Sequence, residues 1–143
     1  MKRFFDILFS FLGILLLLPL LLGIAIVIII ESRGGIFYKQ IRVGKDNQDF
    51  YLIKFRSMYA ESDKKGLLTV GNKDPRVTHI GTFLRKYKLD ELPQLFNVIG
   101  GQMSLVGPRP EVRKYVEIYT AEQRKVLSVR PGITDYASLQ YIN

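Results

Sequence analysis

Hydrophobic and polar positions follow two different patterns along this chain. From Ile7 to Ile30 no charged residue occurs, and this run of about 24 residues is long enough to cross a bilayer. Beyond Glu31, apolar positions recur in shorter patterns among charged residues. We therefore expect an apolar helix over residues 1–31 and one polar domain over residues 32–143, in an α+β fold that is mostly helical.

Pro19 lies almost at the centre of the apolar run. A proline inside a helix removes a hydrogen bond and kinks the helix, which would leave two arms of about 12 residues. Such an arm is roughly 18 Å long, less than the roughly 30 Å hydrocarbon core. Both flanks of the run are basic, which favours the cytoplasm for both. A re-entrant helix–break–helix in one leaflet satisfies these features, and a kinked single-pass helix remains the alternative.

The shorter patterns predict the elements of the polar domain. Residues 36–41 and 50–56 have the composition of two short strands around a polar link, which predicts a β-hairpin. The spacing of apolar residues predicts a helix across residues 80–87. A second helix is expected to start at Asp90 and to bury Leu92, Leu95, Phe96 and Ile99. The remaining expectations are a loop over 61–76, an extended link over 106–110, a helix over 111–119, and a capping box at 120–123 that opens a helix to about Ser128.

Composition limits the chemistry that the chain can perform. It has no cysteine, which excludes disulfides and thiolate metal sites. His79 is its one histidine and has no partner at a spacing typical of a zinc site or a catalytic triad, so a hydrogen-bonding or surface role is expected. The net charge of +8 favours anionic partners such as lipid headgroups and phosphates. Nucleic acid is not an expected partner, because the cations lie among apolar residues suited to a membrane.

Two adjacent carboxylates, Asp90 and Glu91, are the best candidates for a nucleophile and a metal ligand. The ordinary interpretation is structural, since Asp is a favoured N-cap and Glu suits the first turn of a helix. The functional interpretation uses the same position: helix N–H groups and nearby cations would keep Asp90 ionised for attack. Glu91 could then hold Mg²⁺ together with substrate phosphates. The residues alone leave both interpretations open.

Several basic residues could contact phosphate. Lys54 and Arg56 are two apart on a predicted strand and should share a face, and Arg85 lies about one helical turn before Asp90. Arg109 and Arg130 have prolines beside them, which fix the backbone that carries each guanidinium group. Arginine suits bidentate phosphate contacts. Together these residues indicate a phosphate-handling site without identifying the reaction.

A set of motifs runs nearly from end to end of the chain, and their order and spacing are highly specific. By these motifs the chain resembles the monotopic phosphoglycosyl transferases, bacterial sugar transferases that initiate the assembly of surface polysaccharides and glycoprotein glycans. The motifs are Lys2-Arg3-Phe4-Phe5-Asp6 before the apolar run, Lys54-Phe55-Arg56-Ser57-Met58, Asp74-Pro75-Arg76-Val77-Thr78, Leu89-Asp90-Glu91-Leu92-Pro93-Gln94-Leu95, Met103-Ser104-Leu105-Val106-Gly107-Pro108-Arg109-Pro110 and Arg130-Pro131-Gly132-Ile133-Thr134.

The resemblance implies a reaction in which a nucleotide sugar, usually a UDP-sugar, gives its phosphosugar to a polyprenyl phosphate. In such enzymes the Asp of the dyad, here Asp90, forms a covalent phosphosugar intermediate, Mg²⁺ is required, and Glu91 would assist the metal beside Asp90. The resemblance also implies a re-entrant anchor, which places residues 32–143 as an interfacial catalytic domain on the cytoplasmic face of a bacterial inner membrane. The state as a monomer or homodimer stays open. The expected phosphate contacts are Arg85, Lys54, Arg56, Arg109 and Arg130, and Thr134 is expected to contact substrate or nucleotide.

The chain departs from the family pattern after Thr134. Asp135-Tyr136-Ala137-Ser138-Leu139 stands where the family commonly has Gly followed by Trp-Ala-Gln-Val, and the C-terminal segment of the family is expected to be absent. The alternative from another functional class is a non-catalytic scaffold that is tethered to the membrane and binds anionic lipid through its basic face. Substitution of Asp90 separates the enzyme from the scaffold.

Overall fold

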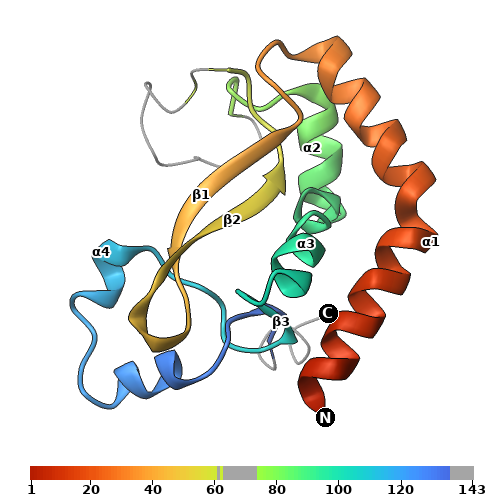
Figure 1. Ribbon diagram of the computed structural model, residues 1–143. Helices are drawn as coiled ribbons and strands as arrows, with labels where there is room; N and C mark the ends of the chain where they lie inside the picture. The colour runs from red at the N-terminus through yellow and green to blue at the C-terminus, as the bar shows by residue number, and fades with distance from the viewer. Residues whose placement is uncertain (61, 63–73, 136–143) are drawn as a thin grey trace. The chain divides into compact units, whose positions relative to one another are not determined.

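The computed structural model describes residues 1–60, 62 and 74–135, and these residues form two compact units. Unit 1 comprises Met1–Leu16, Lys39–Ile53 and Gln94–Asn143, and unit 2 comprises Leu17–Tyr38 and Lys54–Pro93. Helix accounts for 50% of the structure, and two small sheets supply the strands (Figure 1). The expected mixture of helix and strand is therefore confirmed. The loop expected over 61–76 lies mostly outside the described residues.

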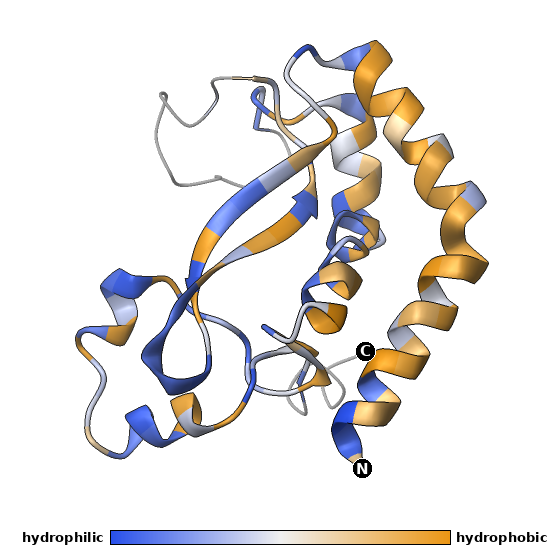
Figure 2. Cartoon of the chain, in the orientation of Figure 1, coloured by the Kyte–Doolittle hydropathy of each residue, from blue (hydrophilic) through white to orange (hydrophobic). Residues whose placement is uncertain are grey.

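The apolar run forms α1, Lys2–Glu31, which contains Pro19. Its ribbon is coloured as hydrophobic over most of its length in Figure 2. It is long and apolar enough to cross a membrane, the one such helix in the described part of the chain. Many of its large side chains are exposed, including Leu16 at 80% and Ile30 at 79%. The helix continues through Pro19, so the break expected there is not confirmed.

Within unit 1, the start of α1 presents its polar groups to the protein and its apolar groups outward. Asp6 and Ser10, four residues apart on one helix face, are buried, whereas Phe9 is exposed. The Asp6 carboxylate accepts hydrogen bonds from Ser104 Oγ at 2.8 Å and from the Leu105 N–H at 3.3 Å. This pattern is the reverse of a soluble amphipathic helix and suits apolar surroundings.

Two cations at the start of α1 also bind backbone carbonyl groups of unit 1. Lys2 Nζ donates to the carbonyl of Val106 at 2.9 Å. Arg3 donates to the carbonyls of Met103 at 3.2 Å and Ile99 at 3.1 Å. Ile99 is the last residue of α3, Gln94–Ile99, so Arg3 satisfies a carbonyl that the helix end leaves free.

The predicted hairpin is confirmed as β1, Phe37–Val43, and β2, Asp49–Phe55, which pair in a two-stranded sheet. The single turn η1, Lys45–Asn47, connects them, with Asp46 and Asn47 in the left-handed region that such residues tolerate. The alternating burial of β2 turns Phe50 and Leu52 inward. There they join Val98 and Met103 in the core of unit 1, with Leu105 and Ile133 packed against it.

A buried asparagine ties α3 to the hairpin. Asn97 is 1% exposed, and its Nδ2 donates to the Tyr51 carbonyl and to Gln102 Oε1, both at 2.7 Å. Its Oδ1 accepts the Ile53 N–H at 3.0 Å. Each polar atom of the buried amide is therefore paired, as burial requires. The apolar pattern of the sequence did not predict a buried amide here. It predicted burial of Phe96 and Ile99, which is wrong, because both stay exposed while α3 buries Gln94, Asn97 and Val98.

A second sheet was not predicted. The strand β3, Ser104–Val106, pairs in parallel with β4, Gly132–Thr134, so that Ser104 lies opposite Gly132 and Val106 opposite Thr134. The extended link expected at 106–110 begins inside β3. A Cβ on Gly132 would overlap the backbone of Gly107, so the two backbones approach too closely for a side chain there.

The segment between these strands contains two short helices. The expected helix over 111–119 is reduced to α4, Arg113–Val116. The capping box is confirmed: the Thr120 N–H donates to Gln123 Oε1 at 2.9 Å, and the Gln123 N–H donates to Thr120 Oγ1 at 3.3 Å. The helix that follows is the 3₁₀ element η4, Gln123–Ser128, rather than an α-helix.

In unit 2, the end of α1 meets the start of α2, His79–Lys86. Glu31 accepts the N–H groups of His79 at 2.6 Å and Ile80 at 2.9 Å, two donors that have no partner inside the helix. Thr78 is the N-cap and accepts the Gly81 N–H at 2.9 Å. The expected hydrogen-bonding role of His79 is confirmed, since its exposed ring also lies 3.0 Å from Glu31.

Candidate functional site

Asp90 and Glu91 lie on η3, Leu89–Glu91, a single 3₁₀ turn between α2 and α3. Lys88 precedes η3 in the left-handed conformation, and Pro93 separates η3 from α3. The expectation that one helix starts at Asp90, with Asp90 as its N-cap, is therefore wrong. A turn and a proline instead divide this segment into two short elements.

Glu91 forms an ion pair with Lys54, which is near the end of β2. The Lys54 Nζ to Glu91 Oε1 distance is 3.1 Å, and each side chain is 19% exposed. A pair this far removed from solvent is less screened than a surface salt bridge. The strand thus places an ammonium group directly at the acidic pair. The expected contact of Lys54 with substrate phosphate stays a prediction.

The side chain of Asp90 is affected by three charged neighbours. Burial raises the pKa of the Asp90 carboxyl group, the positive charge of Lys54 lowers it, and the negative charge of Glu91 raises it further. The backbone N–H of Asp90 and the charge of Arg85 also lower this pKa. Burial is the largest of these effects, so the pKa of Asp90 lies above its ordinary value. Two cations and one local N–H oppose that rise, rather than the free N–H groups of a helix end.

Arg85 lies on the last turn of α2, within electrostatic reach of Asp90. Its expected contact with substrate phosphate stays a prediction. Its Nε donates a 2.9 Å hydrogen bond to Ser57 Oγ. Ser57 is 9% exposed and follows β2 closely. The sequence analysis did not single out Ser57, although it stands in the motif of residues 54–58. The signal that could have found it is its position directly after Arg56 in that motif.

A second ion pair in unit 2 was also missed. The Arg76 Nη2 lies 2.6 Å from Asp74 Oδ2, and the Arg76 Nε contacts both carboxylate oxygens of Asp74. Hydrogen bonds from the Arg76 side chain and backbone lower the pKa of Asp74 to about 2, and the charge of Arg85 lowers it too. Arg85 therefore has the ionised carboxylate of Asp74 near it as well as the carboxyl group of Asp90.

Arg56 has a different environment from Lys54. Its guanidinium group lies against Gly34, where a Cβ would overlap Arg56 Nη1, and Gly34 has φ of +140°. Both the close approach and the backbone angle require glycine there. Arg56 is absent from the charges that affect Asp90, so its expected phosphate contact stays a prediction.

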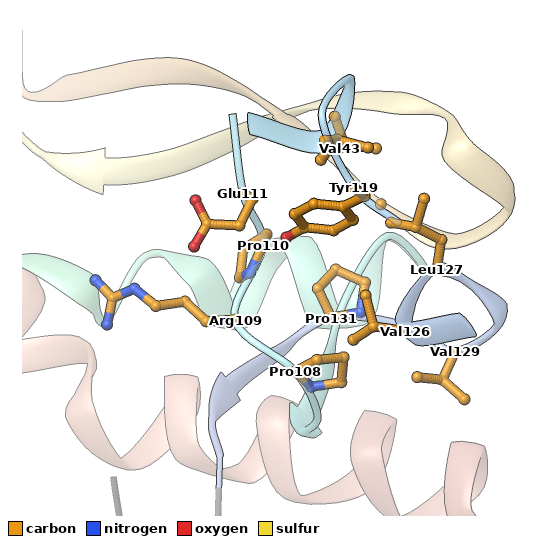
Figure 3. A pocket seen from close by; sticks show the side chains of 12 residues that line it. Val43, Pro108, Arg109, Pro110, Glu111, Tyr119, Val126, Leu127, Val129 and Pro131 are labelled. Atoms are coloured by element: carbon orange, nitrogen blue, oxygen red, sulfur yellow. The ribbon is translucent and has the colours of Figure 1, made fainter. Parts of the chain in front are cut away.

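Three other predicted residues, Arg109, Arg130 and Thr134, belong to unit 1. Arg130 Nε donates to the Gly101 carbonyl at 2.8 Å, and Thr134 ends β4. Arg109 borders a small pocket in unit 1, and Figure 3 shows its guanidinium group extending away from the apolar lining. The apolar lining consists of Val43, Pro108, Pro110, Val116, Tyr119, Val126, Leu127, Val129 and Pro131.

The donor set of the acidic pair fits magnesium. In the described part of the chain no three carboxylate or imidazole groups gather into a complete protein cage for a metal. Mg²⁺ is usually held by only one or two carboxylates, with substrate phosphates and water completing its six ligands. Asp90 and Glu91 supply such a pair, and Lys54 Nζ donates to Glu91 Oε1 at 3.1 Å.

Comparison with known proteins identifies relatives along the whole chain. Residues 1–143 match the family described as bacterial sugar transferase. The chain is 45% identical over 143 residues to a UDP-N-acetylgalactosamine-undecaprenyl-phosphate N-acetylgalactosaminephosphotransferase of Aeromonas hydrophila, a match that covers 96% of this chain and 33% of the relative. It is 45% identical over 121 residues to a putative undecaprenyl-phosphate N-acetylgalactosaminyl 1-phosphate transferase of Bacillus subtilis, covering 85% of this chain and 68% of the relative.

A third relative is named for the production of exopolysaccharide. The exopolysaccharide production protein ExoY of Sinorhizobium fredii is 39% identical over 148 residues, which cover 93% of this chain and 66% of the relative. The chain therefore spans about a third of the Aeromonas protein and about two thirds of the Bacillus and Sinorhizobium proteins. Because the match to the family extends over every residue, this chain belongs to the bacterial sugar transferases.

Proposed function

We propose that this chain transfers a phosphosugar from a nucleotide sugar, with UDP as the expected nucleotide, to a polyprenyl phosphate. The observation that carries the proposal is the half-buried Asp90–Glu91 pair with Lys54 and Arg85 acting on it. The names of the relatives support the substrates, since they specify undecaprenyl phosphate with UDP-N-acetylgalactosamine or UDP-glucose. These two UDP-sugars are the donors to test first.

The chemistry follows from the groups at this site. An Asp90 carboxylate oxygen attacks the phosphorus that bears the sugar, the bond to the bridging oxygen breaks, and uridine monophosphate leaves with the electron pair. The product is an acyl phosphate on Asp90. A phosphate oxygen of the polyprenyl phosphate then attacks the same phosphorus, releasing the Asp90 carboxylate and forming a polyprenyl diphosphate sugar.

The cations serve both steps. Negative charge concentrates on the phosphoryl oxygens and on the leaving nucleotide, and a fixed ammonium and guanidinium group stabilise such charge in a site with little water. Asp90 and Glu91 would hold Mg²⁺, which when bound neutralises charge on the substrate diphosphate. Lys54 at Glu91 also orients the carboxylate that would hold the ion.

We also propose that α1 enters and leaves the membrane on the cytoplasmic side. Its start is bonded to polar parts of unit 1 through Asp6 and Lys2, and its end is bonded to α2 through Glu31. The chain passes from unit 1 to unit 2 inside β2, between Ile53 and Lys54, where no membrane segment intervenes. These bonds support the proposal that both helix ends lie on one side of a membrane.

Labelling of introduced cysteines tests this topology, because the chain has no cysteine of its own. Cysteines at Lys2 and Arg33 are both expected to react with a membrane-impermeant maleimide only when the cytoplasmic face is open to it. A cysteine at exposed Lys114 gives the reference for the polar domain. Labelling of position 2 and position 33 from opposite faces would establish the single-pass alternative.

Trapping of the acyl phosphate tests the proposed reaction. The purified chain incubated with Mg²⁺ and a radiolabelled UDP-sugar, without lipid acceptor, is expected to gain the mass of one phosphosugar on the peptide containing Asp90. Added undecaprenyl phosphate should then remove the label from the protein and transfer it to lipid. Membrane binding with no adduct and no transfer for either donor would instead favour the lipid-binding scaffold.

A further inference from the structure

We propose that Ser57 is a positioning residue for phosphosugar transfer, because its hydroxyl group fixes the Arg85 guanidinium group while its carbonyl group fixes the start of the helix that carries Arg85. The inference rests on the function proposed above. Ser57 itself contacts no substrate phosphate and acts through Arg85.

Ser57 is bonded on two sides. Its Oγ accepts the Arg85 Nε–H at 2.9 Å. Its carbonyl oxygen accepts the Thr78 N–H at 3.1 Å and, at 3.4 Å, the Thr78 hydroxyl. Thr78 is 1% exposed and Ser57 9%, so these bonds are made with little competition from water.

The helix α2 approaches Ser57 along one face. Thr78, Gly81 and Arg85 share this face, since residues three and four apart are neighbours on a helix surface. A Cβ on Gly81 would overlap the Ser57 carbonyl oxygen, so the first turn of α2 lies in direct backbone contact with Ser57. Thr78, which is bonded to Ser57, also caps α2 by accepting the Gly81 N–H.

The bond to Ser57 determines which part of Arg85 remains available. A guanidinium group has five N–H donors in a fixed plane. The Nε–H lies alongside one terminal N–H, and the two N–H groups at the end of the guanidinium form a separate, end-on fork. With Nε held by Ser57, the plane is fixed and the terminal nitrogens stay available for that fork. No described residue accepts a hydrogen bond from them. They are the fork that makes bidentate contacts with a phosphoryl group.

A long side chain such as that of Arg85 otherwise samples many rotamers. A cation that is already oriented stabilises the transition state more than a mobile one does. Loss of the Ser57 hydroxyl should therefore lower kcat more than it raises KM. It should do so only while Arg85 is present. This dependence separates positioning through Arg85 from a general effect on folding.

A double-mutant cycle tests the inference, using Ser57→Ala, Arg85→Ala and the double variant in the purified chain with undecaprenyl phosphate and the better of the two UDP-sugars. We expect Ser57→Ala alone to lower kcat about tenfold with KM changed less than about threefold. In the Arg85→Ala background, the same change should alter kcat less than about twofold. An equal loss in both backgrounds would overturn the proposal.

Two further variants control for folding. Thr82→Val removes a different hydroxyl group on α2, one that donates to the Thr78 carbonyl. This variant should keep the wild-type kcat. Ser57→Cys keeps the side-chain size but offers a weak acceptor, so it should fold like the wild type in a thermal melt and show a loss close to that of Ser57→Ala. Wild-type kcat in folded Ser57→Cys would refute the role of the hydroxyl group. Retained transfer by Asp90→Asn would refute the covalent mechanism and leave the measured coupling of Ser57 to Arg85 unaffected.

Discussion

Replacing Asp90 by asparagine is expected to lower phosphosugar transfer by at least about 10³-fold, because an amide has no anionic oxygen to attack the diphosphate. The side chains have nearly the same shape, and an amide oxygen can still accept the local N–H that Asp90 accepts. Fold and membrane binding should therefore remain. Initial rates of labelled lipid formation and the burst of uridine monophosphate release measure the effect together.

A matched substitution shows whether the loss is specific. Asp46→Asn makes the same chemical change at an exposed turn residue with φ of 57°, a conformation that asparagine adopts readily, so its transfer rate should equal that of the wild type. Asp90→Glu is the second comparison, because it keeps the charge but moves the oxygen by one methylene group. If Asp90→Asn retained more than about a tenth of the rate, direct attack by the lipid phosphate would replace the covalent mechanism.

Substitution of Lys54 by methionine is expected to lower kcat about 10²-fold and to move the acidic limb of the pH–rate profile upward. The charge of Lys54 lowers the pKa of Asp90, while burial and Glu91 raise it. Without Lys54 this pKa rises further, so the reactive carboxylate is lost at a higher pH as the solution is acidified. Removal of a cation from a desolvated charge site typically costs about 10² to 10³ in rate.

The pH dependence of kcat/KM in Lys54→Met separates the two effects, since lost phosphate binding alone would leave the acidic limb in place. Lys39→Met serves as the control, because Lys39 is an exposed lysine on β1 of the same hairpin. Its profile should match that of the wild type. An acidic limb that moved downward in Lys54→Met would contradict the stated effect of Lys54 on Asp90.

Structural features that depend on residues close together in the sequence were predicted well. The hairpin follows from alternating residues around a polar link, and the capping box at Thr120 follows from side chains three residues apart. The helix across residues 80–87 is present as α2, although Phe83 and Tyr87 are exposed and pack against each other with ring centroids 4.9 Å apart. Each of these features depends on neighbours in the sequence.

Features that depend on distant partners were not predicted. The parallel β3–β4 pair consists of strands of 3 residues, which are too short to show a period of their own. The amide of Asn97 is buried because its partners lie on the hairpin and at the end of α3, which no apolar pattern reports. The turn at Lys88 likewise adopts a conformation for which a lysine gives no signal.

The candidate site shows the same division. The sequence identified the acidic pair and the cations that act on it, Lys54 and Arg85. It did not identify Ser57 or the pair of Asp74 with Arg76, because a hydroxyl or carboxylate on a loop becomes informative only when its partner is known.

The buried Asp6 has a consequence for how the protein is made. Asp6 and its partner Ser104 are 98 positions apart in the chain. At typical translation rates of about 5–20 residues per second, Asp6 is synthesised roughly 5–20 s before that hydroxyl exists. Through that interval the carboxylate needs water, headgroups or another protein as its partner. The start of α1 therefore reaches its final contacts only after the ribosome has passed residue 104.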